Sequence, residues 1–208
     1  MGGKADPKIG TPDSGTPKVY EDAPEQHGNP DAHEFLDSGQ CTPQMIELLQ
    51  NKAFDAAPEG VNWTATPINA TYPIVTTDDG IAEQSPTEKA WMGGIVSGTD
   101  SLYQDIIIPA TATSLVLSGY YEVRTSETGA TIYDRGSLNL TTTTGALIEA
   151  IASYDNTHPT TSWTVLNHSF GSASAGQTVR LYFTTTNDFS NETSFFFDSL
   201  SLQAMACP

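Results

Sequence analysis

This sequence has few positively charged residues. Its 208 residues include 8 Lys and Arg against 25 Asp and Glu, which gives a net charge of −17. A chain this negative repels the phosphates of nucleic acids and the head groups of anionic lipids. We therefore expect no nucleic-acid partner and no docking to an anionic membrane surface.

Long apolar runs are also missing. No stretch approaches the roughly 20 apolar residues that cross a bilayer, so no transmembrane segment is expected. The first residues, Met1-Gly-Gly-Lys, lack the apolar run of a secretory leader. We expect a mature chain from which such a leader has been removed, in preference to a cytosolic protein.

Charged residues are scarce, and hydroxyl side chains take their place. Charged residues make up 16% of the chain, below the roughly 25% of an ordinary globular protein. From residue 41 onward there are 26 Thr and 16 Ser. This composition is typical of a β-rich protein that is secreted or held at the cell surface.

Residues 1–40 have the composition of a tail. They contain five Pro and six Gly, three Lys against eight acids, and no apolar periodicity. Such a segment buries too little surface to offset its chain entropy, so we predict a disordered acidic tail or linker. Its first residues resemble the start of a mature bacterial lipoprotein, with Met1 in the place of the lipid-bearing Cys. This implies a lipid anchor in the native precursor; an ordinary disordered terminus is the alternative.

Residues 41–208 read as a single β-domain. Apolar and polar residues alternate within short runs that end in turn residues, and no amphipathic helix with credible caps is found. The pattern predicts an all-β fold, an antiparallel two-sheet β-sandwich of jelly-roll type. The expected strands are 45–50, 63–66, 72–77, 90–94, 101–108, 114–125, 131–142, 147–154, 161–169, 177–186 and 193–202.

Three segments in this domain carry a family resemblance. They are 48–63, with Leu-Leu-Gln-Asn-Lys-Ala-Phe-Asp and a later Val-Asn-Trp; 90–109, with Ala-Trp-Met-Gly-Gly; and 194–202, with Phe-Phe-Phe-Asp-Ser-Leu-Ser-Leu. In this order they resemble the opening, middle and closing motifs of jelly-roll carbohydrate-binding modules, which are galactose-binding-like β-sandwiches. The resemblance implies the same fold and a non-catalytic, glycan-directed role.

The resemblance also implies a structural Ca²⁺ between the start of the first strand and the end of the last. The matching positions are Asp55 and Asp198. Ca²⁺ takes six to eight oxygen ligands, which carboxylates and loop carbonyls provide. Asp55 stands where the family has Glu, and Ser199 where it has a second Asp, so both departures bear on metal affinity. The alternative is that both carboxylates are turn residues.

The two cysteines flank the predicted domain. Cys41 precedes its first strand and Cys207 follows its last. If those strands are neighbours, as in a jelly roll, a disulfide closes a loop of 167 residues. Loop entropy then contributes up to about 5 kcal/mol. This arrangement suits an exported protein; two free thiols are the alternative.

Aromatic side chains are the candidates for a sugar site, because pyranose rings stack on them. Trp63 and Trp91 lie in the framework motifs, so we expect them to be buried. Tyr120 and Tyr121 are adjacent on one strand, so only one of them faces the core. We predict that this pair supplies the ligand-binding residue. The full set of candidates is Trp63, Trp91, Tyr103, Tyr120, Tyr121, Trp163 and Tyr182.

No motif of nucleophilic, zinc or phosphate chemistry is present in the sequence. Glu127 and Asp134 flank a predicted hairpin, where hydrogen bonding across the turn is favoured over cation binding. We therefore predict a non-catalytic extracellular or cell-surface module that binds a polysaccharide or surface glycan. The alternatives are an assembly protein that forms oligomers or filaments through edge strands or its N-terminal arm, and a hydrolase of glycans or esters.

Overall fold

Every regular element of this computed structural model is a β-strand. It describes residues 41–78 and 80–208, so the predicted tail, 1–40, lies outside the described residues. Within that part of the chain no helix is long and apolar enough to cross a membrane. The strands are β1 (Gln44–Glu47), β2 (Thr64–Thr66), β3 (Val75–Thr76), β4 (Lys89–Gly93), β5 (Gly98–Ile107), β6 (Ser114–Thr125), β7 (Arg135–Thr142), β8 (Leu147–Asp155), β9 (Thr164–Ser169), β10 (Thr178–Asn187) and β11 (Thr193–Ala206).

The predicted all-β class is confirmed, and each of the eleven predicted runs overlaps one strand. The largest differences lie at strand ends. The run 72–77 shrinks to two residues, because Pro73 has no N–H to give to a ladder. The run 131–142 begins only at Arg135, because the backbone N–H groups of Tyr133 and Asp134 donate to the Asn156 side chain instead of a strand.

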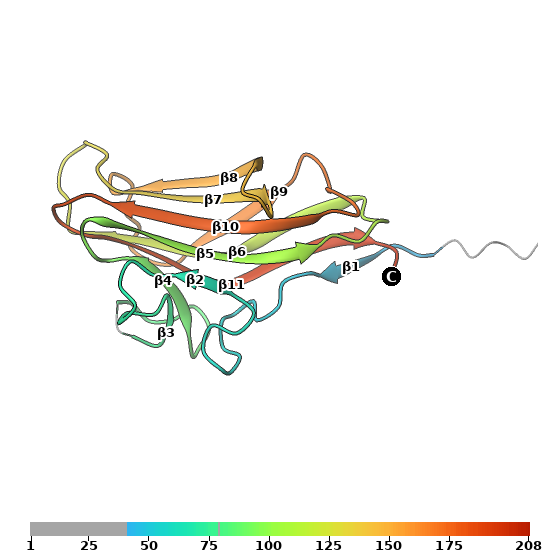
Figure 1. Cartoon of the computed structure of the whole chain (residues 1–208), viewed down its shortest axis with the longest axis horizontal. Coiled ribbons are helices and arrows are strands. Elements are labelled where there is room, and N and C mark those ends of the chain that lie inside the picture. The colour runs from blue at the N-terminus through green and yellow to red at the C-terminus, as the bar shows by residue number, and fades with distance from the viewer. Residues whose placement is uncertain (1–40, 79) are drawn as a thin grey trace, which may run out of the picture. The chain divides into compact units, whose positions relative to one another are not determined.

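The strands form two antiparallel sheets that face each other as a sandwich (Figure 1). One sheet has the order β3-β4-β11-β6-β9, and the other β2-β5-β10-β7-β8. The long strand β11 organises the first sheet. Its first half pairs with β4, its last residues pair with β1, and β6 lies along its other side.

The core lies between the sheets and follows the alternation of the strands. In β11, Phe195 and Phe197 point inward, and in β10 Leu181 and Phe183 do the same. The rings of Phe183 and Phe197 are 4.7 Å apart between centroids, so an aromatic contact joins the two sheets directly. The residues between them in sequence consequently point outward, onto the two outer faces.

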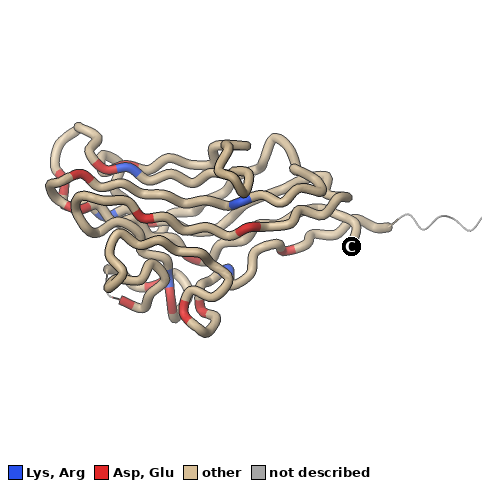
Figure 2. The backbone as a smooth tube through the Cα atoms, viewed as in Figure 1, with Lys and Arg blue, Asp and Glu red and all other residues tan. Residues whose placement is uncertain are grey.

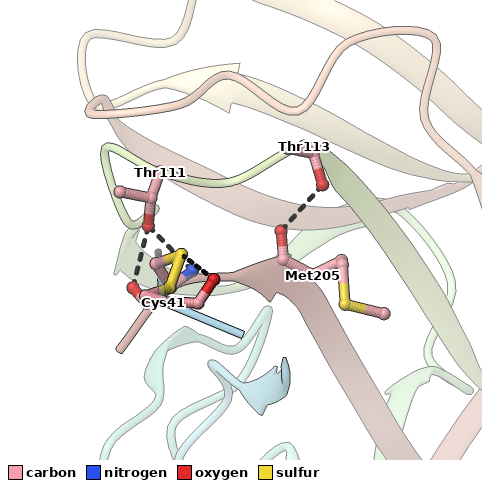
Figure 3. The surroundings of a disulfide bond; sticks show 5 residues. Cys41, Thr111, Thr113 and Met205 are labelled. Atoms are coloured by element: carbon pink, nitrogen blue, oxygen red, sulfur yellow. Dashed lines mark hydrogen bonds between the residues drawn. A yellow bond between two sulfur atoms is a disulfide. The ribbon is translucent and has the colours of Figure 1, made fainter. Parts of the chain in front are cut away.

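The predicted disulfide between Cys41 and Cys207 is confirmed (Figure 3). It forms because β1 and β11 are neighbours, which brings the two Cα atoms to 5.7 Å. Thr111 holds the same end, since its Oγ1 donates to the Cys207 carbonyl at 2.8 Å and accepts the Cys207 N–H at 3.0 Å. The start of the described chain is thus tied to its end.

Candidate functional sites

The outer face of the β3-β4-β11-β6-β9 sheet is covered by the chain itself over β4 and the first half of β11. Residues 80–88, here called the covering loop, lie across it. The Trp163 Nε1–H donates to the carbonyl of Ala82 at 2.9 Å. Lys89 is fully buried, and its Nζ lies 3.1 Å from the Glu83 carboxylate. Phe196 points away from the core and is nevertheless buried, in contact with Trp91.

The covering loop is held by the two carboxylates that the sequence proposed as calcium ligands. Asp198 is fully buried, and its Oδ2 accepts the N–H groups of Gln84 and Ser85, both at 2.9 Å. Asp55 Oδ1 accepts the N–H groups of Thr87 at 2.6 Å and Glu88 at 2.8 Å. The fold thus brings Asp55 and Asp198 to neighbouring turns of one loop.

The electrostatics of this loop favour a cation. Burial raises the pKa of Asp198 to about 6, backbone N–H donors oppose the rise, and the nearby charge of Asp55 adds to it. Burial also raises the pKa of Glu88, and the charges of Glu59 and Asp55 add to that rise. These carboxylates therefore sit in surroundings that penalise their negative charge.

Two oxygens in the same loop lack partners. Glu88 Oε2 and Ser85 Oγ are buried without a hydrogen bond among the described residues. A hard cation would use such oxygens. No three His, Cys, Asp or Glu side chains of residues 41–78 and 80–208 are grouped closely enough to form a metal cluster. The donor set fits calcium in its chemistry, and the ion remains a prediction.

The outer face of the β2-β5-β10-β7-β8 sheet, here called the open face, carries polar side chains in cross-strand rows. Directly opposed residues of antiparallel strands lie on the same side of a sheet, so the strand register gives the rows. The centre of one row carries aromatic and amide side chains, and every member of the next row carries a hydroxyl group. The first is Thr64, Tyr103, Tyr182, Asn139 and Ala150, and the second is Thr66, Ser101, Thr184, Ser137 and Ser153.

Two tyrosines and an ion pair give this face a fixed centre. The rings of Tyr103 and Tyr182 lie edge to face with centroids 6.2 Å apart. The Arg180 guanidinium lies 3.6 Å above the Tyr103 ring. It also forms a bidentate pair with Asp105, Nε to Oδ1 at 2.7 Å and Nη2 to Oδ2 at 3.0 Å. These residues, with Asn139, are called the tyrosine platform below.

Hollows flank the tyrosine platform on both sides. One, of about 400 Å³, is lined by Asn62, Thr64, Tyr103 and Asp105 among others. The other, of about 290 Å³, includes hydroxyl groups of the second row. The open face therefore offers stacking surface, hydrogen-bonding groups and concave space along one continuous sheet.

Free positive charge is scarce over the described part of the protein (Figure 2). Residues 41–208 contain five Lys and Arg against 17 Asp and Glu. Four of those five cations are paired with an acid: Lys52, Lys89, Arg124 and Arg180. The surface therefore suits a neutral ligand better than an anionic one.

The predicted ligand pair lies on the other sheet. Tyr121 packs against the core, with its ring 4.8 Å from that of Tyr154. Tyr120 points outward from β6, opposite Asp198 and Val165. Nothing joins either ring to the tyrosine platform, and their ligand-binding role stays a prediction. Trp63 is buried, as expected of its motif, whereas Trp91 is only half-buried.

The second acidic group stabilises a turn. Asp134 is fully buried, and its carboxylate accepts the Asp188 N–H at 2.8 Å and the Thr193 hydroxyl at 2.5 Å. Glu127 receives weaker hydrogen bonds from Ser190 and Asn191. The expected hairpin is wrong, because β6 and β7 lie in different sheets. Both carboxylates instead join the 126–134 loop to the segment between β10 and β11 at the same end of the sandwich.

No protein-family model and no curated protein matches this chain. Solved structures do match in fold. The carbohydrate-binding module TmCBM61, solved with β-1,4-galactotriose, aligns with a TM-score of 0.52 at 13% identity, over 76% of this chain and 97% of that one. The CBM22-1 xylan-binding domain of Paenibacillus barcinonensis Xyn10C aligns with 0.47 at 12% identity, over 82% and 100%. The first similarity shows that this chain has the β-sandwich fold of carbohydrate-binding modules.

Proposed function

We propose that this protein is a non-catalytic module that binds a neutral polysaccharide through the tyrosine platform. The observation that carries the proposal is the cross-strand row of Tyr103, Tyr182 and Asn139 on an open sheet face, beside the Arg180–Asp105 pair. The fold, which it shares with TmCBM61, supports the same conclusion.

The chemistry of the platform suits a sugar chain. The C–H face of a pyranose packs on an aromatic ring, and its hydroxyls exchange hydrogen bonds with fixed polar groups. Asp105 and Asn139 accept such bonds, and Arg180 and Asn139 donate them. Because Arg180 is already neutralised by Asp105, the platform offers no net positive charge to a uronate or a sulfate. The open ends of the row leave room for the middle of a chain.

Affinity electrophoresis in gels containing galactan, xylan or arabinan tests the platform, with polygalacturonate as the acidic control. Retardation by at least one neutral polymer is expected, and none by the acidic one. Tyr182→Ala should weaken binding about tenfold, since a stacking aromatic contributes about 1 kcal/mol or more. The matched control is Tyr133→Ala, an exposed tyrosine of the 126–134 loop. Equal retardation of wild type and Tyr182→Ala would refute the platform.

We also propose that the protein works outside the cell, as a secreted or surface-held module. The disulfide between Cys41 and Cys207 supports this, because disulfides persist in oxidising compartments. A lipid anchor in the native precursor belongs to the same proposal. Metabolic labelling of the native precursor with a radioactive fatty acid tests the anchor, and an unlabelled product would contradict it.

A structural Ca²⁺ at the covering loop completes the proposal. Asp55, Asp198, Glu88 and Ser85 would hold it. Its charge would offset the burial, and the smaller repulsion from Asp55, that raise the pKa of Asp198. A ligand at 100 times its dissociation constant stabilises the native state by about 2.7 kcal/mol. The Tm should therefore be higher in Ca²⁺ than in EDTA, and Asp55→Ala should remove this difference in Tm. Identical melts of the wild type would exclude the ion.

Self-assembly is the second candidate, and one feature favours it. Strand β8 is nine residues long, lies at the edge of its sheet and exposes 64% of Leu147. An edge of this kind can pair with another chain. Its two register irregularities against β7 work against such pairing. Light scattering over a concentration series decides: a constant monomer mass would exclude assembly through β8. The N-terminal arm, the other predicted route, lies outside the described residues.

A further inference from the structure

A second cavity lies away from the tyrosine platform, at the corner where the chain passes from β4 to β5. Its volume is about 350 Å³, within the range of small-molecule sites. Trp91, Tyr72 and Ile68 form apolar walls, and Asp78, Asp100 and Asn69 add polar groups. This space is called the corner cavity below.

The corner cavity is built into the fold, because Asp100 ties its two walls together. This carboxylate is buried, and it accepts the N–H of Ile68 from one wall and that of Gly93 from the other, the latter at 2.5 Å. Gly93 and Gly94 both have positive φ, and a Cβ on Gly94 would lie 2.9 Å from Trp91 Nε1. The Trp-Met-Gly-Gly motif therefore shapes the wall that holds the indole ring.

The Trp91 ring is held in a fixed orientation. Its Nε1–H donates to Ser194 Oγ at 2.9 Å, and its ring packs on the buried ring of Phe196 at 5.4 Å between centroids. Because Trp91 is half-buried and also lines the cavity, part of the ring remains open to a ligand. Tyr72, which is 57% exposed, stands at the rim. A preorganised indole of this kind needs no reordering when a ligand packs on it.

The polar groups indicate the class of ligand. The cavity lining contains two carboxylates and an amide but no Lys or Arg. Such a wall accepts hydrogen bonds from hydroxyls and repels carboxylates, sulfates and phosphates. The apolar ring beside it suits a ligand with a C–H face and a rim of O–H groups. The cavity is only partly enclosed, and its volume of about 350 Å³ suits one sugar ring. The row on the open face, in contrast, runs across all the strands of its sheet.

We propose that the corner cavity is a second glycan site, which binds the terminal residue of a neutral polysaccharide. The inference rests on the proposed function and extends it from one site to two. The two sites lie on different outer surfaces of the sandwich, since Trp91 projects from the β3-β4-β11-β6-β9 sheet and the platform from the other. One molecule would then hold a chain end and a chain interior at once.

Indole N–H signals in NMR spectra of the full chain provide the test. The probes are the methyl glycosides of galactose, glucose, xylose and arabinose, and methyl glucuronoside is the acidic control. Three indoles are present, and Trp91→Phe identifies the signal of Trp91. At least one neutral glycoside should shift this signal, whereas the glucuronoside should not.

Variants separate the two sites. Tyr72→Ala should weaken the Trp91 response about tenfold, and because Tyr72 is mostly exposed the variant should fold. Tyr133→Ala and Tyr182→Ala should leave the response unchanged. No Trp91 shift with any neutral glycoside, or equal weakening by Tyr72→Ala and Tyr182→Ala, would overturn the inference. Failure of the platform gives a different result. Tyr182→Ala would then bind the polymers as well as wild type does, while the neutral glycoside still shifted the Trp91 signal.

Discussion

On both outer faces of the sandwich, every second residue of a strand points away from the core, but such residues are buried under the covering loop on one face and exposed on the other. On the β3-β4-β11-β6-β9 sheet, the covering loop buries Phe196, Lys89 and Asp198, all of which point away from the core. On the other sheet, Tyr103 and Tyr182 occupy equivalent outward positions and remain half-exposed. Outward direction alone therefore does not decide whether a side chain meets a ligand; what lies over the sheet does.

This difference separates stability from recognition. Under the covering loop this face acts as a second, smaller core with charged groups in it, so the residues there, apart from the lining of the corner cavity, should matter mainly for folding. The open face is held by the strands beneath it, so its residues should matter mainly for binding. Matched substitutions on the two faces test this division, and their expected effects on the free energy of unfolding differ several-fold.

The largest expected effect comes from Phe196→Ala. Phe196 is almost fully buried between its strand and the covering loop, in contact with Trp91. Truncating such a ring costs about 3–5 kcal/mol. Tyr182→Ala on the open face should cost less than about 1 kcal/mol. Urea unfolding measures both losses, provided that the variants have similar m-values. Equal losses in the free energy of unfolding would mean that the open face also stabilises the fold.

The charge buried on the covered face should give stability a pH dependence. In the folded protein the pKa of Asp198 is about 6, above its ordinary value of 3.8. A raised pKa means that the folded state holds the proton more tightly, so this contribution is complete below about pH 4 and disappears as the pH rises through 6. The loss amounts to roughly 3 kcal/mol.

Urea unfolding in EDTA at several pH values measures this contribution. The relevant quantity is the difference between wild type and Asp198→Asn, because other groups titrate in the same range. Wild type should lose stability relative to the variant between about pH 4 and pH 6.5. Bound Ca²⁺ should reduce this slope, since the cation stabilises the ionised carboxylate. A difference that does not vary with pH would show that Asp198 keeps an ordinary pKa.

Local patterns in the sequence predicted the strands well but could not predict what covers them. Short β-type runs bounded by turn residues, several of them alternating, located all eleven strands, and the position of the cysteines predicted their disulfide. Alternation also places Tyr182 on the polar side of its strand, between Leu181 and Phe183. The adjacent pair Tyr120 and Tyr121 attracted the ligand prediction because two aromatic rings stood side by side.

What could not be predicted depends on contacts between distant segments. The pairing of Tyr182 with Tyr103 is set by the register of β10 on β5, across 79 residues (182 − 103). The covering loop reaches Asp198 across 113 residues. The sequence marks residues 80–88 as a connection, without showing which face it covers. The corner cavity depends in the same way on Asp100, which no motif singled out.

The smallest expected effect concerns an ion pair on the open face, which is compared here with a pair under the covering loop. Arg180 and Asp105 lie on the open face, where the Asp105 side chain is 40% exposed, so water screens them. Asp105→Asn should change the free energy of unfolding by less than about 1 kcal/mol. Lys89 is fully buried, and removing its partner leaves an uncompensated buried charge. Glu83→Gln should therefore cost about 2–3 kcal/mol. This is less than for a fully buried pair, because Glu83 is partly exposed and the Asp78 carbonyl still accepts a hydrogen bond from Lys89.

Urea unfolding at low and at high salt compares the two variants. A larger loss for Asp105→Asn would place the stabilising charges on the open face and reverse the division of roles.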